Sequence, residues 1–356
     1  MGINCFSNSA KCKEPSTIFL APMAGYTDSA FCHIATENGA DGTFSEMISM
    51  EALYRDNEKT LKMIRPASNA KIFGLQLFGG DHTKVEKSIN LVMKFFPSII
   101  DLNCGCPVLK IIKSGAGSSL LQRPSEIYKI LSRMKEVIDS YNLDCRPKLS
   151  VKIRLGYDHS HINFLEVADV ALEAGVDMIT LHGRTKSDLY SGKANWEAIT
   201  LLKEHIVKVA PQVRVFGSGD LFTALDGYKM LAETKVDGIM YARGAVGNPW
   251  IFNQTKRLLE KFPISENKIE QTKLSDLEEY LNSLKPTYSQ VVSTLLEHIN
   301  LATNLHGKRV ALNEMKKHIG SYLKAFNNVK ELRKELLLCQ DMGELVQHLL
   351  TLNNHQ

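Results

Sequence analysis

The sequence lacks the long apolar runs that mark membrane and exported proteins. No window of its 356 residues offers the roughly 18 uncharged apolar residues that a membrane-spanning helix requires. Residues 1–16 contain no apolar stretch long enough for the central region of a signal peptide. We therefore expect a cytoplasmic protein that has no membrane partner.

The cysteines do not form the patterns of a disulfide framework or a zinc site. There are seven, an odd number, scattered from Cys5 to Cys339, which does not fit a disulfide-stabilised fold. Cys104 and Cys106 have the spacing C-x-C, but no second pair of Cys or His lies nearby, and the redox spacing C-x-x-C is absent. We expect no metal, and we interpret Cys104 as a small core residue.

The net charge of +4 is too small to identify a partner by itself. Basic residues are nevertheless concentrated near the C-terminus, where residues 306–334 contain eight Lys or Arg and two Glu. The basic residues are Lys308, Arg309, Lys316, Lys317, Lys324, Lys330, Arg333 and Lys334. Such a cluster is typical either of a solvated helix face or of a surface that binds an anionic partner such as RNA.

Eight short apolar runs recur along the first two thirds of the chain, and most are separated by stretches of helical period. They span residues 17–25, 42–49, 72–80, 99–107, 149–156, 178–185, 213–220 and 238–245. Strands that alternate with helices indicate parallel βαβ units, and eight such units predict an α/β fold of the (β/α)₈ TIM barrel type. We assign residues 1–16 to an N-terminal extension and residues 17–255 to the barrel.

Residues 256–356 have a different texture and predict a C-terminal α-helical domain. Glycine becomes rare there, strand-like runs disappear, and apolar residues recur at helical spacing. The apolar residues of this stripe include Met315, Ile319, Tyr322, Leu323 and Phe326. We interpret the stripe as the core of the helical domain.

Polar residues interrupt several predicted strands near their carboxyl ends. They are Glu46, Gln76, Asp101, Asn103, Lys152, Arg154, His182 and Arg184. Strands of a parallel barrel are buried on both faces and should be almost entirely apolar, and active sites of such barrels lie at the carboxyl ends of the strands. One such residue could be a satisfied core residue, but their recurrence at the same end of five strands predicts a ligand site.

The turns after the last two predicted strands favour an anionic ligand. The segments "FGSGD" (216–220) and "YARGAVGNP" (241–249) are rich in small residues whose backbone N–H groups can approach a phosphate, and Arg243 adds a fixed charge. No G-x-G-x-x-G follows the first strand, so a Rossmann-bound dinucleotide is not indicated. The pattern fits a phosphorylated cofactor better than a free metal.

Together, the strings at the strand ends resemble the flavin-dependent tRNA-dihydrouridine synthases of bacterial type. They are "APMAGYTDSAF", "SEM", "QLFG", "DLNCGCP" with "KSGAGSSLL", "VKIRLG", "HGRT", "GSGD" and "ARGAVGNPWIF", in order from residue 17 to about 255. The C-terminal segment "NEMKKHIGSYLKAF" is similar to the helical domain of the same family. Any one string is weak evidence, whereas all of them in register are specific.

The resemblance implies reduction of the C5–C6 double bond of specific uridines in tRNA by bound FMN, which NADPH or NADH reduces. It implies that Cys106 is the catalytic proton donor to C5, and that Asn103 and Arg184 orient the uracil or the adjoining RNA. The implied FMN contacts are Pro22, Met23, Ala24, Gln76, Lys152, His182, Ser218, Gly219, Asp220, Ala242 and Arg243. The helical domain, residues 256–356, would bind tRNA, and we expect a monomer.

Two positions depart from the family pattern, and two other functions stay open. Cys104 stands where a bulky apolar residue is usual, and Ser218 stands where Asn is common. One alternative is an FMN-dependent dihydroorotate or dihydropyrimidine dehydrogenase that acts on a free base, although such enzymes do not usually carry a basic helical domain. The other is an RNA-binding barrel without a cofactor, which the presence of Cys106, Lys152 and Arg243 disfavours.

Overall fold

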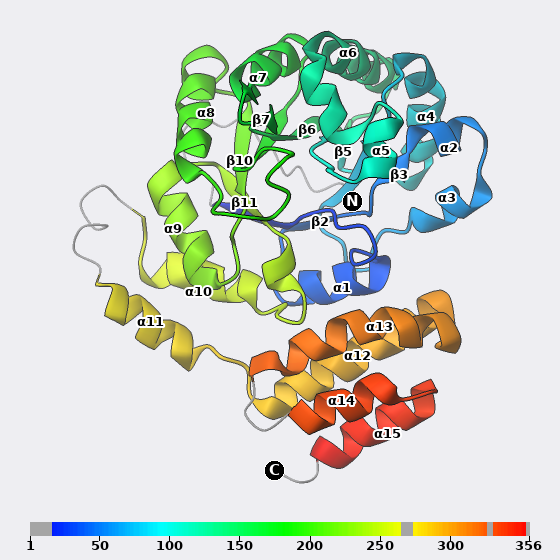
Figure 1. Ribbon diagram of the computed structural model, residues 1–356, viewed down its shortest axis with the longest axis vertical. Helices are drawn as coiled ribbons and strands as arrows, with labels where there is room; N and C mark the ends of the chain where they lie inside the picture. Colours follow the sequence, from blue (N-terminus) through cyan, green and yellow to red (C-terminus); the bar gives the residue numbers. More distant parts are fainter. Residues whose placement is uncertain (1–15, 265–272, 326–329, 354–356) are drawn as a thin grey trace.

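Eight parallel strands form a closed barrel in the computed structural model, which describes residues 16–264, 273–325 and 330–353 (Figure 1). The strands are β1 (Thr17–Leu20), β2 (Gly42–Phe44), β4 (Phe73–Phe78), β5 (Ile99–Cys104), β6 (Lys148–Arg154), β9 (Met178–His182), β10 (Arg214–Ser218) and β11 (Gly238–Tyr241). The pairing of β2 with β4 closes the barrel, with Thr43 opposite Phe73. Each strand coincides with one of the eight predicted runs, with β6 beginning one residue before its run, so the TIM barrel prediction is confirmed.

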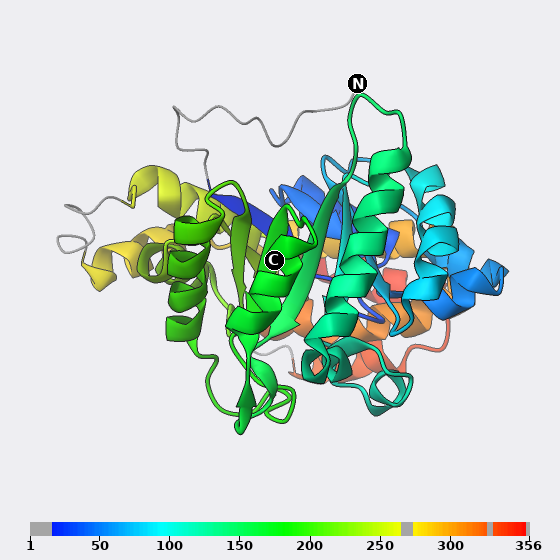
Figure 2. The ribbon, with the colours of Figure 1, turned by 90° about the horizontal axis from the view of Figure 1, so that it is seen from above.

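Helices connect the strands and cover the outside of the barrel (Figure 2). They are α1 (Ser29–Glu37), α2 (Met50–Tyr54), α3 (Glu58–Met63), α4 (Val85–Val92), α5 (Leu109–Lys113), α6 (Pro124–Ser140), α7 (Phe164–Glu173), α8 (Trp196–Val209), α9 (Ala224–Thr234) and α10 (Ile251–Lys261). Short 3₁₀ turns are η1 (His82–Lys84), η2 (Met93–Phe95), η3 (Gly117–Gln122) and η4 (Arg243–Ala245). Strand β3 (Ile48–Ser49) extends the sheet beside β4, and β7 (Gly156–Asp158) pairs with β8 (His161–Ile162) in a hairpin after β6.

Helix α6 shows how the sequence determines these covering helices. Pro124 occupies its first turn, where the missing N–H costs nothing. Its apolar residues recur at intervals of three and four, so they form one face that is buried against the strands. The buried residues are Ile127, Ile130, Leu131, Met134, Val137 and Ile138.

Strand alternation divides the apolar residues of the barrel into two cores. In β1, Ile18 and Leu20 belong to the outer core between strands and helices, whereas Phe19 belongs to the inner core that fills the barrel. The rings of Phe19 and Phe216 stack in this inner core with centroids 4.9 Å apart. The same alternation directs residues 101 and 103 of β5 and residue 152 of β6 toward the barrel interior.

The C-terminal helices form a second core, as the helical stripe predicted. Helices α12 (Tyr288–His306), α13 (Lys308–Tyr322), α14 (Lys330–Leu338) and α15 (Met342–Asn353) bury Met315, Ile319, Tyr322 and Leu323 among themselves; the turn η5 (Leu323–Ala325) follows α13. Phe326 lies outside the described residues. Helices α12 and α13 lie beside α1 of the barrel (Figure 1).

Helices α10 and α11 (Leu274–Ser283) link the barrel to this bundle. Leu258 of α10 and Leu277 of α11 are buried in the outer core of the barrel. The predicted domain boundary after residue 255 therefore falls inside α10, and the second core begins with α12. Among the described residues, no helix combines the length and apolar character needed to cross a membrane.

The inner core makes a direct prediction about stability. We expect Phe216→Ala to lower the free energy of unfolding by about 3–5 kcal/mol, because it leaves a cavity inside the barrel beside Phe19. The matched control is Phe96→Ala, since Phe96 is 85% exposed, and we expect a change below about 1 kcal/mol. Urea denaturation measures both, and equal effects of the two substitutions would contradict the assignment of the inner core.

Candidate active site

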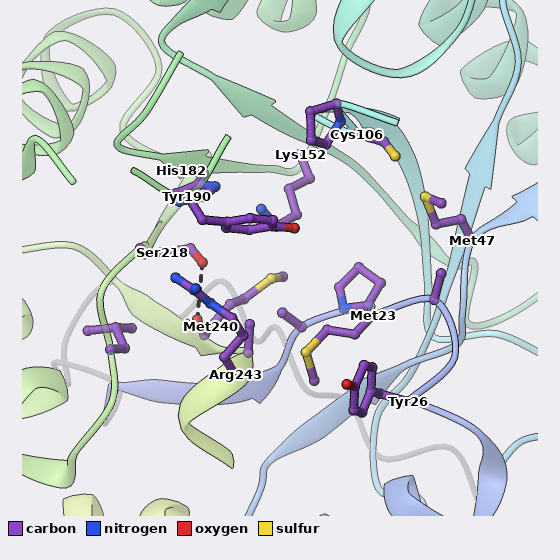
Figure 3. A pocket seen from close by; sticks show the side chains of 18 of the residues that line it. Met23, Tyr26, Met47, Cys106, Lys152, His182, Tyr190, Ser218, Met240 and Arg243 are labelled. Atoms are coloured by element: carbon purple, nitrogen blue, oxygen red, sulfur yellow. Dashed lines mark hydrogen bonds between the residues drawn. The ribbon is translucent and has the colours of Figure 1, made fainter. Parts of the chain in front are cut away.

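A cavity of about 580 Å³ lies at the carboxyl ends of the barrel strands (Figure 3). The loops after several strands line it, and Lys317 and Ser321 of α13 add to its wall. Figure 3 shows Cys106 and Met47 on one side of the cavity and Ser218, Met240 and Arg243 on the other. Five of the eight polar residues that interrupt the strands line this cavity, namely Gln76, Asn103, Lys152, Arg154 and His182.

All but one of the predicted site residues line this cavity. The residues that do so are Pro22, Met23, Ala24, Gln76, Asn103, Cys106, Lys152, His182, Ser218, Gly219, Asp220, Ala242 and Arg243. They come from seven different strands or the loops that follow them, and they are far apart in the sequence. The exception is Arg184.

The segment that carries Cys106 is held by hydrogen bonds to Asn103. The side-chain oxygen Oδ1 of Asn103 accepts hydrogen bonds from the backbone N–H of Gly105 at 3.1 Å and of Cys106 at 2.9 Å. Below the turn, the carbonyl oxygen of Cys106 accepts from the backbone N–H of Ser118 at 3.1 Å. The Cys106 side chain lines the cavity, whereas Cys104 is fully buried in the outer core.

A chain of buried hydrogen bonds connects Asn103 to the centre of the barrel. The amide nitrogen Nδ2 of Asn103 donates to Oε1 of Gln76 at 2.8 Å, and Nε2 of Gln76 donates to Oδ2 of Asp101 at 2.7 Å. The hydroxyl of Ser150 donates to Oδ1 of Asp101. We call these four residues the Asp101 chain. Because Asp101 can only accept while ionised, it fixes which way the Gln76 amide points.

The Asp101 chain engages both ends of the Asn103 amide within the protein. The Nδ2 of Asn103 also lies 3.4 Å from the sulfur of Met47, and the Oδ1 of Asn103 accepts the hydrogen bonds that hold the Cys106 turn. This geometry positions Cys106, and it leaves the predicted contact of Asn103 with the substrate as an expectation. Burial raises the pKa of Asp101 to about 6 against the opposing hydrogen bonds from Ser150 and Gln76.

Buried cations give the cavity a positive electrostatic character. Burial and the neighbouring charge of Arg154 together lower the pKa of Lys152 to about 8, although the carboxylate of Asp101 partly opposes the shift. Burial and the charge of Lys152 also hold the pKa of His182 well below its usual range, so His182 is neutral at pH 7. With Arg243 at the opposite wall, the cavity is suited to an anionic ligand.

Arg184 lies outside the cavity, which corrects its predicted position. It is 2% exposed, and its guanidinium pairs with the carboxylate of Asp220 at 2.8 Å. The carbonyl oxygens of Ser191 and Gly192 accept its remaining hydrogen bonds. Strand alternation continued to residue 184 predicts a side chain that faces the site, but β9 ends at His182. Arg184 therefore anchors Asp220, a cavity residue, and does not itself line the cavity.

Two exposed aromatic residues at the cavity were missed by the sequence argument. Tyr190 is 55% exposed and Phe222 is 48% exposed, and the guanidinium carbon of Arg243 lies 4.6 Å and 5.1 Å from their ring centroids. The Tyr190 ring projects into the cavity between Lys152 and Arg243 (Figure 3). The sequence feature that could have indicated this role is the tyrosine in the polar segment "KSDLYSGK", because exposed aromatic rings often stack on planar ligands.

Arg154 and Lys317 were noted in the sequence but not assigned to the site. Arg154 lies on the same face of β6 as Lys152, and its Nη1 donates to the carbonyl oxygens of Thr185 at 2.7 Å and Leu189 at 2.9 Å. It thereby supports the loop that carries Tyr190. Lys317 was counted in the basic cluster, and only the packing of α13 brings it to the cavity.

Within the described part of the chain, one group of possible metal ligands lies away from this cavity. The ligand atoms of Cys339, Glu344 and His348 lie within 4.8 Å of one another. The group belongs to the helical bundle, and none of its members lines the cavity. The chemistry of the cavity therefore does not involve these residues.

Comparison with known proteins identifies similar chains. The family model described as dihydrouridine synthase (Dus) matches residues 19–356. The chain is 37% identical over 308 residues to a probable tRNA-dihydrouridine synthase of Treponema pallidum (strain Nichols), covering 86% of this chain and 84% of that protein. It is 31% identical over 339 residues to the tRNA-dihydrouridine synthase B of Pasteurella multocida (strain Pm70), covering 92% and 93%.

A solved structure supports the fold. DHODH from Eimeria tenella, in complex with ferulenol, superimposes with a TM-score of 0.51 at 16% identity, over 76% of this chain and 89% of that one. At this level of identity the likeness concerns the fold alone.

The environment of Cys106 predicts how its thiol reacts with pH. Burial raises its pKa, although a backbone hydrogen bond and the charge of Arg154 partly oppose the shift. The protonated thiol should therefore predominate at neutral pH, and alkylation by iodoacetamide should accelerate only above the ordinary thiol pKa of about 8.5. Mass spectrometry of the isolated protein from pH 6 to 10 measures this rate. Fast labelling of Cys106 already at pH 6 would indicate a stabilised thiolate and contradict the prediction.

Proposed function

The chain belongs to the dihydrouridine synthase family, and we propose that it reduces the C5–C6 double bond of specific uridines in tRNA to 5,6-dihydrouridine. The observation that carries this proposal is the position of Cys106. Its thiol lies in a cationic cavity, where burial favours the protonated form. A thiol in that state is suited to donate a proton.

The cavity suits flavin mononucleotide as the cofactor in both size and chemistry. Its volume of about 580 Å³ lies within the usual range for ligand sites. At one wall, Arg243 and the small residues Ser218, Gly219 and Ala242 offer a charge and accessible backbone for a phosphate. Gly219 has φ +114°, and a Cβ there would lie 2.7 Å from the His182 ring, so this wall requires glycine. Gln76 and Lys152 would hold the polar edge of the ring system.

We propose NADPH as the reductant and Cys106 as the acid. A reduced flavin, when bound, supplies the hydride for C6 of the uracil. The chain must then deliver a proton to C5, and the Cys106 thiol does so at Sγ. Lys152 has a pKa of about 8 and is therefore charged at neutral pH, so it stabilises negative charge that develops nearby. Asn103 holds the Cys106 backbone in place during this transfer.

The route for tRNA follows from exposed aromatic and basic residues. A uridine inside folded tRNA must leave its base stack to enter the cavity, and this costs a few kcal/mol. The exposed rings of Tyr190 and Phe222 at the cavity could replace part of the lost stacking. Lys308, Arg309 and the other exposed cations of the helical domain supply contacts to the RNA backbone. We propose residues 256–356 as the main tRNA-binding region of a cytoplasmic monomer.

The alternative, a dehydrogenase that acts on a free pyrimidine base, is not favoured. Its support is the barrel fold shared with DHODH, and that fold hosts many unrelated reactions. The family match, in contrast, extends through the helical bundle to residue 356.

A pair of cysteine substitutions tests the proposed chemistry. We expect Cys106→Ala to retain flavin and to oxidise NADPH, but to form dihydrouridine in unmodified tRNA at least about 100-fold more slowly, because the general acid is missing. Cys104→Ala is the matched control and should retain activity, since Cys104 is a packing residue of the outer core. Mass spectrometry of digested tRNA measures the product.

Two results of this experiment would count against the proposal. Full product formation by Cys106→Ala would refute the role of the thiol as acid. Purified wild-type protein that neither contains a flavin nor binds added FMN would refute the cofactor.

A further inference from the structure

Helix α13 of the helical domain forms part of the wall of the barrel cavity. Lys317 and Ser321, one helical turn apart, both line the cavity. His318, on the same face, packs against the Tyr26 ring with centroids 5.5 Å apart, and Tyr26 also lines the cavity. One face of α13 therefore covers the edge of a site whose other walls belong to the barrel.

Lys317 makes a specific contact with the loop after β1. Its ammonium Nζ lies 3.4 Å from the carbonyl oxygen of Gly25, to which it donates. On the other side of the same residue, the backbone N–H of Gly25 donates to the carboxylate of Glu46. Gly25 has φ +76°, a conformation that favours glycine. The peptide groups of Gly25 are thus held by one residue of the barrel and one of the helical domain.

Gly25 ends a loop segment whose preceding residues, Pro22, Met23 and Ala24, line the cavity. Movement of Gly25 would displace this wall. Two carboxylates lie near Lys317, since Glu314 pairs with it at 2.6 Å and the half-buried Glu46 is close by. Lys317 therefore contacts both Glu314 and the carbonyl oxygen of Gly25.

Helix α13 also packs on the loop after β11. Gly247 has φ +71°, and a Cβ at this position would overlap the backbone of Ser321. Beside it, the rings of Trp250 and Tyr322 pack edge to face with centroids 6.2 Å apart. This loop also carries Ala242 and Arg243, which line the opposite part of the cavity. One helix thus touches both the first and the last loop of the site.

The neighbouring Lys316 provides an internal comparison. Its Nζ donates to the carbonyl oxygen of Cys339 at 3.0 Å, and Cys339 follows α14 within the helical bundle. It does not line the cavity. These two adjacent lysines carry the same charge, but only Lys317 lines the cavity.

We propose that the helical domain is a structural part of the flavin site, with Lys317 as a positioning residue that holds the loop of Pro22, Met23 and Ala24 through Gly25. The inference rests on the proposed function, since it assigns these residues to flavin binding. Docking of α13 and retention of flavin are then linked, so the domain that binds tRNA also stabilises the cofactor. Lys317 does not react; it acts through the loop.

Binding of FMN to the full-length apoprotein tests this proposal without any catalytic assay. Titration followed by flavin fluorescence gives the Kd for wild type and for Lys317→Met, Lys317→Arg and Lys316→Met. We expect Lys317→Met to raise the Kd roughly three- to fivefold, the size expected for one hydrogen bond. Lys317→Arg keeps a charged donor and should restore most of the affinity. Lys316→Met should bind FMN like wild type.

The outcomes separate this inference from the proposed function. If wild type binds FMN and Lys317→Met has the same Kd as Lys316→Met, the positioning role is refuted while the proposed function stands. If wild type binds no FMN, both are refuted. The urea midpoint of each apoprotein serves as a control. If Lys317→Met loses as much free energy of unfolding as it loses free energy of FMN binding, the positioning role is also overturned.

Discussion

The ionised carboxylate of Asp101, buried at the centre of the barrel, is the constraint on which the site depends. A buried charge is costly unless hydrogen bonds satisfy it, and Ser150 and Gln76 do so. Because Gln76 must turn its amide nitrogen toward Asp101, its oxygen faces Asn103 and fixes that side chain in turn. The last link holds the backbone of Cys106. The reactive thiol is therefore placed by a chain of contacts that begins inside the barrel.

Burial sets the protonation of the site as well as its geometry. It raises the pKa of the Cys106 thiol and lowers the pKa of Lys152 and His182. At pH 7 this leaves a protonated thiol, a neutral imidazole and a charged lysine around one cavity. A reaction that adds hydride and then a proton to a pyrimidine needs an acid, here the thiol, and groups that stabilise developing negative charge, here the lysine. The neutral imidazole adds a polar contact. Loss of the charge on Lys152 above pH 8 would remove part of this environment.

The sequence was sufficient for the barrel and for most of the cavity, because both follow from local patterns. The eight apolar runs became the eight strands, and polar residues such as Gln76 and Lys152 at their carboxyl ends faced inward as alternation requires. Arg184 was misplaced because alternation holds only within a strand, and β9 ends two residues earlier. Tyr190 and Lys317 were not assigned because a loop and a docked helix bring them to the site. No periodicity in the sequence encodes those tertiary contacts.

The central claim is that this chain modifies uridines in tRNA through Cys106. The most direct measurement maps dihydrouridine, position by position, in tRNA from cells that lack the gene and carry either the wild-type or the Cys106→Ala chain on a plasmid. The account predicts that at least one position loses dihydrouridine in the deletion strain, regains it with wild type, and stays unmodified with Cys106→Ala. An unchanged dihydrouridine pattern in the deletion strain, or equal restoration by both chains, would contradict it.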